Sequence, residues 1–424
     1  MIRLVKGFKD ILPEEAGLWQ YVEAVVRELF DGFGFAELRI PVLEETELFA
    51  RSIGANTDIV EKEMYTFIDR SGASLTMRPE ATASVVRAYI EHKLYGKDPV
   101  WKLYTMGPMF RRERPQKGRY RQFHQINAEV FGLHDPRADA ELILVLMTFL
   151  QRLELRDLAL HVNSLGCPVC RPVFKEALKS FLEGHSGQLC PDCLRRREKN
   201  PLRIFDCKAP ACKEAVKDAP SILEHLCEAC RNHFDTVQRA LEGFHIPCQT
   251  NHRLVRGLDY YTRTTFEVLA QPLGAQDAVA GGGRYDGLVK ALGGPDQPGV
   301  GFAIGVDRLM ALLADRAASF EKRPHLFIAA LGPTAQTRAF EWLQALRLHK
   351  VRTEMDLQDR SLKAQMRRAD KLGASYVLIL GDQELEEEAA VLRDMKTKSQ
   401  QRVPMGDLVS CVVKRIMTEA TATG

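Results

Sequence analysis

The sequence predicts an α+β domain that carries a cysteine-rich insertion and is followed by a smaller α/β domain. The chain has 424 residues, more than one ordinary domain of about 100–200 residues contains. Helical and strand patterns alternate in its first third, and eight of its ten cysteines lie between residues 167 and 230. Strand and helix patterns alternate again from residue 326. These observations predict two or three domains.

The N-terminal part begins with a helix pattern. Leu18–Phe33 has apolar residues at helical spacing, and Gly32 and Gly34 end it. Phe35–Val42 predicts a strand, and Glu61–Asp69 and Ser74–Met77 predict a hairpin. Further strands are predicted over Val100–Tyr104, Tyr120–Ile126, Ala128–Phe131, His161–Asn163, Arg263–Leu269, Ala278–Ala280 and Val300–Ile304, and further helices over Thr82–His92 and Ala138–Leu153.

The C-terminal part begins after a predicted linker, Ala317–Pro324, where apolar periodicity breaks. Strands are predicted over Leu326–Ala330, Arg352–Met355 and Tyr376–Leu380, and helices over Thr334–His349, Ser361–Leu372 and Gly406–Met417. This βαβαβ order predicts a parallel or mixed sheet covered by helices.

Composition narrows the class of protein. The chain is 45% hydrophobic and 27% charged, without a long uncharged apolar run or an N-terminal leader pattern, so we expect a cytoplasmic protein with no membrane partner. The formal net charge of +3 is too small to indicate a nucleic-acid partner. Any such partner must be inferred from local clusters of basic residues.

A basic segment, Phe110–Glu129, contains the clearest chemical signal. Six cations surround the single acid Glu113: Arg111, Arg112, Arg114, Lys117, Arg119 and Arg121. A solvated hairpin tip is the ordinary interpretation of such a run. However, Phe123 lies on the returning strand, where an aromatic ring beside guanidinium groups suits a purine and its phosphates.

Two glycine-rich stretches follow the insertion. Ala278–Leu288 (AVAGGGRYDGL) lacks the G-x-G-x-x-G spacing of a dinucleotide site, so its glycines more simply allow close backbone approach. Gly299–Arg308 predicts a strand that leads into a helix carrying Arg308.

The cysteine-rich stretch contains four close pairs: Cys167 and Cys170, Cys190 and Cys193, Cys207 and Cys212, and Cys227 and Cys230. Without a secretion signal, this spacing indicates reduced thiols or a metal site rather than disulfides. Two Cys₄ zinc sites would use all eight thiols, and a metal would help a module with little core to fold. A set of reduced core thiols is the alternative, and the sequence leaves the pairing open.

The Phe110–Glu129 segment resembles the second signature segment of class II aminoacyl-tRNA synthetases, and specifically of histidyl-tRNA synthetases. Arg256–Thr262 (RGLDYYT) resembles the stretch peculiar to the histidine enzymes, and Gly299–Arg308 resembles the third class II segment. Phe33–Glu44 resembles the class II dimer-interface segment. Met77–Thr82 resembles the amino-acid-binding turn, with Ala81 where glycine is common.

The resemblance implies a domain plan and a set of partners. A catalytic domain, residues 1–164 and 241–320, is expected on a mostly antiparallel sheet flanked by helices. It would carry an insertion, residues 165–240, and precede an α/β anticodon-binding domain, residues 325–424. A homodimer acting on L-histidine, ATP with Mg²⁺ and histidine tRNA is expected.

The resemblance also implies roles for individual residues. Catalytic contacts to the ATP α-phosphate would come from Arg111 and Arg256, and ATP would further contact Glu113, Arg119, Phe123 and Arg308. Histidine would contact Glu80, Ala81, Thr82, Gln125, Glu129, Tyr260 and Tyr261. In these assignments Glu129 and Tyr261 read the imidazole ring.

Other functions fit parts of the sequence. A non-catalytic paralogue that regulates histidine biosynthesis would share the fold, but the four arginines Arg111, Arg119, Arg256 and Arg308 and the C-terminal domain argue against it. A zinc-dependent nucleic-acid-binding module would explain only the insertion. The glycyl, prolyl and threonyl synthetases share the general plan, whereas Arg256–Tyr261 favours histidine.

Overall fold

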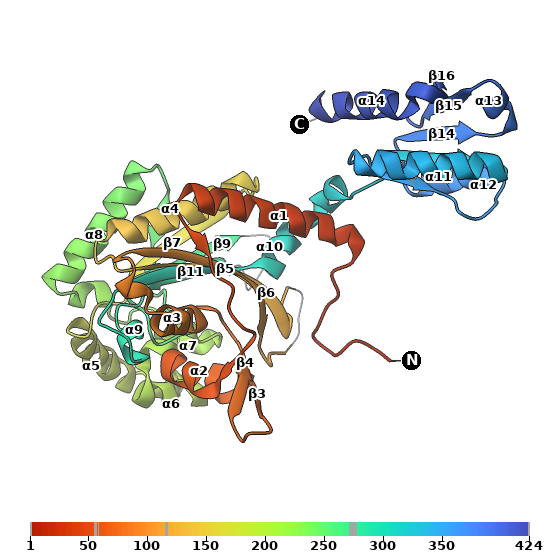
Figure 1. The fold of residues 1–424 in the computed structure, drawn as a ribbon. Helices are drawn as coiled ribbons and strands as arrows, with labels where there is room; N and C mark the ends of the chain where they lie inside the picture. The colour runs from red at the N-terminus through yellow and green to blue at the C-terminus, as the bar shows by residue number, and fades with distance from the viewer. Residues whose placement is uncertain (1, 55–56, 58, 115–117, 271–277, 423–424) are drawn as a thin grey trace. The chain divides into compact units, whose positions relative to one another are not determined.

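The computed structural model describes residues 2–54, 57, 59–114, 118–270 and 278–422 (Figure 1). The chain divides into two compact units, Met1–Phe320 and Glu321–Gly424. Among the described residues, no helix has the length and apolar character needed to cross a membrane.

The larger unit is built on an eight-stranded sheet in the order β1-β5-β6-β11-β10-β9-β7-β8. Its strands are β1 (Ala36–Glu37), β5 (Trp101–Phe110), β6 (Gln122–Phe131), β7 (Leu158–Ser164), β8 (Cys248–Thr250), β9 (Thr262–Ala270), β10 (Ala278–Arg284) and β11 (Gly299–Gly305). Neighbours are antiparallel except at the two edges, where β1 pairs with β5 and β8 pairs with β7 in parallel. The predicted mostly antiparallel sheet is confirmed.

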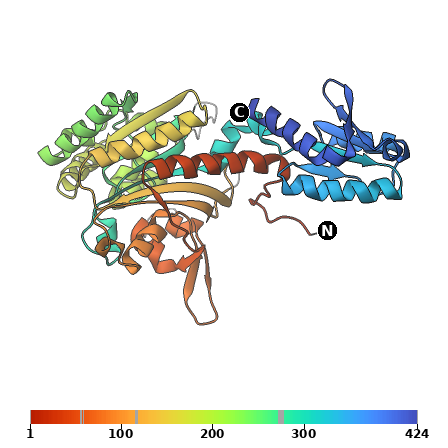
Figure 2. The same cartoon turned by 45° about the horizontal axis from the view of Figure 1, so that its top comes forward.

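Helices cover both faces of this sheet. On one face α1 (Pro13–Gly32), α4 (Arg137–Arg152) and α8 (Glu228–Gly243) contribute to the main hydrophobic core (Figures 1 and 2). The apolar spacing of α1 places Leu18, Val22 and Val26 in that core, and Pro13 starts the helix where no amide partner is needed. Below the sheet in Figure 1 lie α2 (Thr46–Ile53) and α3 (Thr82–Glu91), and the short α9 (Leu288–Ala291) contacts both.

A second, three-stranded sheet changes one sequence-based expectation. It has the order β2-β4-β3, from β2 (Leu43–Glu45), β3 (Tyr65–Ile68) and β4 (Ser74–Met77), and it confirms the predicted β3–β4 hairpin. The single predicted strand Phe35–Val42 was wrong, because the chain leaves the large sheet after Glu37 and joins the small one at Leu43. Pro41, which has no amide to donate, lies in the crossing segment.

The two predicted strands at 120–126 and 128–131 are one strand, β6, whose ten residues pair with β5 over its whole length. β5 was predicted to end at Tyr104 but continues to Phe110 through Gly107 and Pro108. Those two residues, which usually interrupt strands, remain in register opposite Gln125 and His124.

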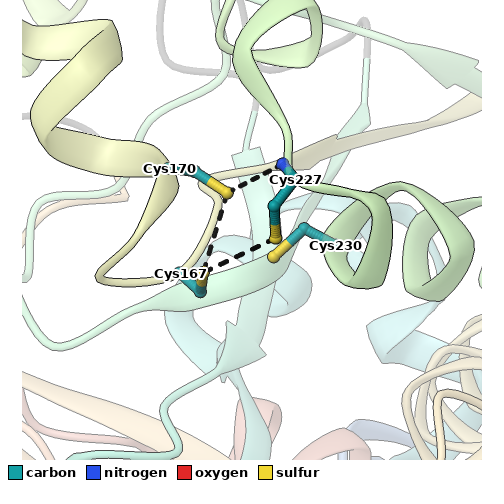
Figure 3. Close-up of side chains that lie close together, drawn as sticks. All are labelled: Cys167, Cys170, Cys227 and Cys230. Carbon is teal, nitrogen blue, oxygen red and sulfur yellow. Dashed lines mark hydrogen bonds between the residues drawn. The ribbon is translucent and has the colours of Figure 1, made fainter.

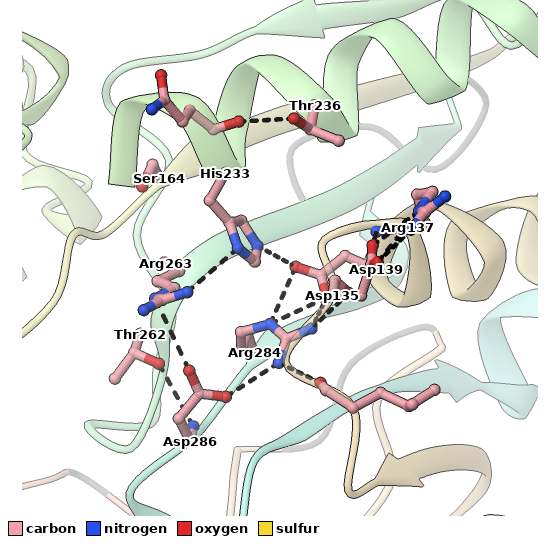
Figure 4. A network of polar contacts seen from close by, with 12 residues as sticks. Asp135, Arg137, Asp139, Ser164, His233, Thr236, Thr262, Arg263, Arg284 and Asp286 are labelled. Atoms are coloured by element: carbon pink, nitrogen blue, oxygen red, sulfur yellow. Dashed lines mark hydrogen bonds and ion pairs between the residues drawn. The ribbon is translucent and has the colours of Figure 1, made fainter. Parts of the chain in front are cut away.

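A buried ionic network joins β10 to α4 and α8 (Figure 4). The Arg284 side chain is fully buried and donates through Nε to Asp139 Oδ1 at 3.0 Å, and through Nη1 to Asp286 Oδ1 at 3.1 Å. Asp139 Oδ2 also lies 2.8 Å from His233 Nε2. Removing one partner of such a network typically costs about 3–5 kcal/mol, so these contacts fix the start of α4 and the middle of α8 on the sheet.

The cysteine-rich stretch has a small core of its own. It contains α5 (Cys170–Glu183), α6 (Pro191–Lys199) and α7 (Pro210–Ala215), joined by short 3₁₀ segments that include Pro201–Asp206. Phe174, Leu178 and Leu182 of α5 are buried against several of the cysteines.

The smaller unit has a five-stranded sheet in the order β13-β12-β14-β15-β16. β12 (Leu326–Ala330) pairs in parallel with β13 (Thr353–Met355) and β14 (Tyr376–Leu380), whereas β15 (Ala389–Asp394) and β16 (Gln400–Pro404) continue it antiparallel. Its helices are α11 (Pro333–Leu348), α12 (Leu362–Lys371), α13 (Asp382–Glu386) and α14 (Leu408–Ala422). The expected helix-covered mixed sheet is confirmed, and the β15–β16 hairpin is an addition.

Candidate active site

One pocket of the larger unit gathers residues that are far apart in the sequence. Strands β6, β9, β10 and β11 contribute Gln125, Glu267, Gly281 and Gly305 to its lining. Other walls come from the turn before α3, the β5–β6 connection, the segment before β9 and the start of α10 (Val306–Leu312). The predicted nucleotide and amino-acid residues therefore meet at one place on the sheet.

Four arginines, Arg111, Arg119, Arg256 and Arg308, line this pocket. Arg308 donates through Nη1 to the Ala278 carbonyl at 2.5 Å. Burial lowers the pKa of Arg308, and the positive charges of Arg119 and Arg111 lower it further. Arginines whose like charges repel one another in this way form a site for a polyanion such as a triphosphate.

An aromatic ring lies beside these cations. The guanidinium carbon of Arg111 is 5.2 Å from the centroid of Phe123, and Arg111 Nε donates to the Pro79 carbonyl at 2.9 Å. Arg119 Nη1 is 2.8 Å from Glu113 Oε2. This end of the pocket offers a stacking surface, an acceptor and positive charge, which together match a purine nucleotide.

The first turn of α3 contributes an acid and a hydroxyl. Glu80 accepts hydrogen bonds from the amides of Thr82 (2.8 Å) and Ala83 (2.9 Å), which begin α3. Burial raises the pKa of Glu80, although these amides and Arg111 oppose that shift. Nearby, Gln125 is mostly buried, and its Oε1 has no hydrogen-bond partner among the described residues. Both side chains line the pocket and offer acceptors for an ammonium group.

Glu129 lies behind the pocket wall rather than in its lining. Its carboxylate accepts from Thr82 Oγ1 at 2.7 Å and from the Tyr285 hydroxyl, and its side chain is almost fully buried. Burial raises the pKa of Glu129 to about 8, because the two hydroxyl donors offset only part of the desolvation cost.

Two adjacent phenols, Tyr260 and Tyr261, form another wall. Their ring centroids are 4.7 Å apart, and Tyr260 is 5.7 Å from the Tyr285 ring. Burial raises the pKa of Tyr261 to about 12, so its hydroxyl remains protonated at neutral pH. The phenols provide hydrogen-bonding groups on an otherwise apolar surface.

Two glycines make room for the charged groups. A Cβ on Gly301 would lie 1.6 Å from Glu129 Oε2, and a Cβ on Gly281 would lie 2.5 Å from Arg256 Nη1. Arg256 Nη1 also pairs with Glu267 Oε1 at 2.5 Å. The close approach expected for the glycines of Ala278–Leu288 is confirmed at Gly281, where the Arg256 guanidinium approaches, and at Gly282, where the neighbouring strand does; Gly301 lies outside that stretch and carries no such expectation.

Most predicted site residues come together here. All of those assigned to ATP line the pocket, as do all of those assigned to histidine except Ala81 and Glu129. Ala81 is fully buried with φ −99°, so alanine causes no backbone strain where glycine is common. Residues 115–117 of the basic segment lie outside the described residues.

Sequence reasoning missed several neighbours: Asn127, Glu267, Tyr285 and Asp307. Asn127 could have been found from the sequence. Every second residue of a strand faces the same side of the sheet, so Gln125, Asn127 and Glu129 share one face of β6. Glu267 and Tyr285 carry no such signal, since their importance depends on the pairing of β9, β10 and β11.

The cysteines form two groups. The first cysteine group contains Cys167, Cys170, Cys227 and Cys230 (Figure 3). The second cysteine group contains Cys190, Cys193, Cys207 and Cys212. Within each group the sulfur atoms all lie within 4.8 Å of one another. The Sγ–Sγ distances are 3.6 Å for Cys167–Cys170, 3.9 Å for Cys167–Cys227 and 3.9 Å for Cys190–Cys207. Disulfide sulfurs are about 2.0 Å apart, so these contacts are not disulfides.

Comparisons with known proteins agree with the pocket. A family model described as histidyl-tRNA synthetase matches residues 7–186 and 191–309. The chain belongs to the histidyl-tRNA synthetase family. A second model, an anticodon-binding domain, matches residues 325–415.

Several relatives match over nearly their full length. Histidine–tRNA ligases from Desulfatibacillum aliphaticivorans and Desulfosudis oleivorans are 57% and 58% identical to this chain, covering 98% and 97% of it and 99% and 98% of those proteins. The crystal structure of apo histidyl-tRNA synthetase from S. aureus has a TM-score of 0.82 at 36% identity, with 97% of this chain and 100% of that chain covered. This histidyl-tRNA synthetase family member therefore has the class II fold predicted from its sequence.

The raised pKa of Glu129 predicts a pH effect on stability. Between its ordinary pKa of 4.5 and about 8, the folded protein holds a proton that the unfolded chain has released. The stabilising contribution is therefore fully present below pH 4.5 and is lost as the pH rises through about 8. Glu129→Gln removes this titration. The Tm of the variant minus the Tm of the parent should therefore increase from about pH 5.5 to about pH 8.5. Thermal unfolding measures this, and parallel curves for the two proteins would contradict it.

Proposed function

We propose that this chain activates L-histidine with ATP and transfers the histidyl group to the 3′ end of histidine tRNA. The observation that carries the proposal is one pocket in which four arginines and an aromatic ring adjoin acids, an amide and phenols. The arginines and the aromatic ring suit a nucleoside triphosphate. The acids, the amide and the phenols suit an amino acid with a polar ring.

At the nucleotide end, Arg111 and Arg256 are assigned to the α-phosphate, and Arg119 and Arg308 to the outer phosphates. Phe123 stacks on adenine, and Glu113 accepts from the adenine amino group. ATP enters as its magnesium complex.

At the amino-acid end, Glu80, Thr82 and Gln125 are assigned to the ammonium group of histidine. Ala81 is assigned a contact to histidine through its backbone. Glu129 and Tyr261 are assigned to the imidazole ring, and Tyr260 to its pocket. Since Glu129 lies behind the lining, on the Thr82 hydroxyl, the ring must reach past Thr82 to meet it. A site that hydrogen-bonds a polar group of its substrate can reject analogues lacking that group by about 10⁴–10⁵.

The reaction has two steps. The histidine carboxylate attacks the α-phosphorus in line, forming histidyl-adenylate and releasing pyrophosphate. A ribose hydroxyl at the 3′ end of the tRNA then attacks the acyl carbon, and AMP leaves. Negative charge develops on phosphoryl oxygens in the first step, so Arg111 and Arg256 act by fixed electrostatic stabilisation.

The smaller unit supports an RNA partner. Lys363, Arg367 and Lys371 are exposed on α12. The basic residues Arg360, Lys363, Arg367, Arg368 and Lys371 recur at helical spacing, and two of them are partly engaged, since Arg360 and Arg368 lie 3.8 Å and 3.3 Å from the buried Asp356. The three exposed cations are the better candidates for phosphate contact.

A homodimer and a cytoplasmic location remain predictions. The dimer is supported by the Phe33–Glu44 segment, whose β1 forms an edge of the large sheet with an open side. The proposed domain boundaries, 1–164 with 241–320, 165–240 and 325–424, also remain predictions.

The assignment of Arg111 predicts a loss of adenylate formation. Arg111→Ala should lower kcat in histidine-dependent pyrophosphate exchange by about 10²–10³, the usual effect of removing one transition-state donor. Arg112→Ala is the matched control, because its exposed side chain does not line the pocket. Exchange should occur with histidine alone among the twenty amino acids. Exchange with another amino acid, or equal effects of the two variants, would contradict the proposal.

Each cysteine group is further proposed to hold one zinc ion. Four sulfurs at about 2.3 Å from a tetrahedral ion lie about 3.8 Å apart, and the three Sγ–Sγ distances of 3.6–3.9 Å match that spacing. The spacing favours a single ion in each group, because a metal–sulfide cluster would hold the thiolates farther apart. Eight reduced core thiols without metal are the alternative.

Metal analysis tests the zinc sites. Protein purified without added zinc should contain about two zinc ions per chain, and Cys193→Ser should lose about one of them. Cys248→Ser is the control, since Cys248 lies outside both groups. Less than about one zinc per chain, with all eight thiols titratable, would refute the proposal.

A further inference from the structure

The segment Arg256–Tyr261 carries three residues assigned to the active site, Arg256, Tyr260 and Tyr261, but has little regular structure. It contains no helix or strand, and β9 begins only at Thr262. The backbone hydrogen bond of Asp259 to Ile53 (3.2 Å) is a link between this segment and the catalytic part of the unit. The Arg256 guanidinium pairs with Glu267 of β9, and other side chains bond the main chain of the segment.

The cysteine-rich stretch supplies three side chains that bond the segment. Arg203 Nη1 donates to the Arg256 carbonyl at 3.0 Å, and Asn200 Nδ2 donates to Asp259 Oδ1 at 3.0 Å. Arg171 donates through Nη2 to the Tyr261 carbonyl and through Nε to the Leu165 carbonyl. The main chain of Arg256 and that of Tyr261 are thus bonded from the insertion.

These three side chains lie next to the cysteine groups in the sequence. Arg171 directly follows Cys170 of the first group. Asn200 and Arg203 lie between Cys193 and Cys207 of the second group, and Arg203 is part of the 3₁₀ segment that ends just before Cys207. Closing either group around an ion would fix the backbone from which these side chains extend.

We infer that the insertion is a positioning element for the active site, in which the two cysteine groups hold Arg171, Asn200 and Arg203 against the Arg256–Tyr261 segment. Metal loading then sets the rate of histidine activation before any tRNA binds. The inference rests on the proposed function, because it concerns the same pocket. It differs from a role for the insertion in binding tRNA alone, which would leave adenylate formation untouched.

The two arginines should affect different kinetic parameters. Arg203 bonds the residue assigned to the α-phosphate, so Arg203→Ala should lower kcat of pyrophosphate exchange by about tenfold to a hundredfold, the range expected for a small misplacement. Arg171 bonds the residue assigned to the imidazole, so Arg171→Ala should mainly raise the KM for histidine. In Arg171→Ala the KM for ATP should change less than the KM for histidine.

The controls separate positioning from folding. Arg203→Lys keeps a donor and should recover part of the lost kcat. Arg195→Ala removes an equal charge from the same helix–turn region. Among the described residues Arg195 forms an ion pair with Asp192 and has no hydrogen bond to the Arg256–Tyr261 segment, so exchange by this variant should match the parent. A purely structural defect would lower Tm and the active fraction without separating kcat from KM.

The metal dependence has its own experiment. Cys193→Ser, which removes one ligand of the second group, should lower kcat of pyrophosphate exchange, as Arg203→Ala does. Both variants are measured as full-length protein without tRNA. If Arg203→Ala retains parental exchange, or if Cys193→Ser loses its zinc and still exchanges normally, the inference is overturned. Failure of the parent protein to exchange histidine would instead overturn the proposed function.

Discussion

Two glycines on adjacent strands of the central sheet are the constraint on which the pocket depends. Gly301 of β11 pairs with Glu129 of β6, and Gly281 of β10 pairs with Glu267 of β9. Because neither glycine has a Cβ, the Glu129 carboxylate and the Arg256 guanidinium can lie directly over the sheet. Any side chain at these positions would displace the Glu129 carboxyl or the Arg256 guanidinium, both of which the proposed chemistry uses.

A buried ionic network holds two helices of the unit on the same sheet. The buried Arg284–Asp139 pair fixes α4 against β10, and His233 links α8 to the same carboxylate. Since α8 begins just after Cys227, this network lies close along the chain to the first cysteine group. The cysteine-rich stretch and the helix α8 that follows it are therefore attached to the sheet unit through His233 and to the Arg256–Tyr261 segment through Arg171, Asn200 and Arg203.

Sequence reasoning predicted the parts whose signals are local. Hydrophobic periodicity predicted α1, α3 and α4, and the basic segment predicted the residues of the arginine-lined end of the pocket. It failed where tertiary pairing decides: the strand expected at 35–42 divides between two sheets, and β16 has a single buried residue, too few for an alternating pattern. The pairing of the cysteines and the role of Tyr285 likewise depend on contacts between distant segments.

Glu129, seated over Gly301, is proposed to read the imidazole of histidine. Isothermal titration of histidine and of ATP into Gly301→Ala tests it, with Gly287→Ala as control because a Cβ at Gly287 meets no atom within 4 Å. Gly301→Ala should bind histidine at least about tenfold more weakly than the parent, roughly 1.4 kcal/mol, and should bind ATP as the parent does. Parental histidine affinity in Gly301→Ala would contradict this role of Glu129.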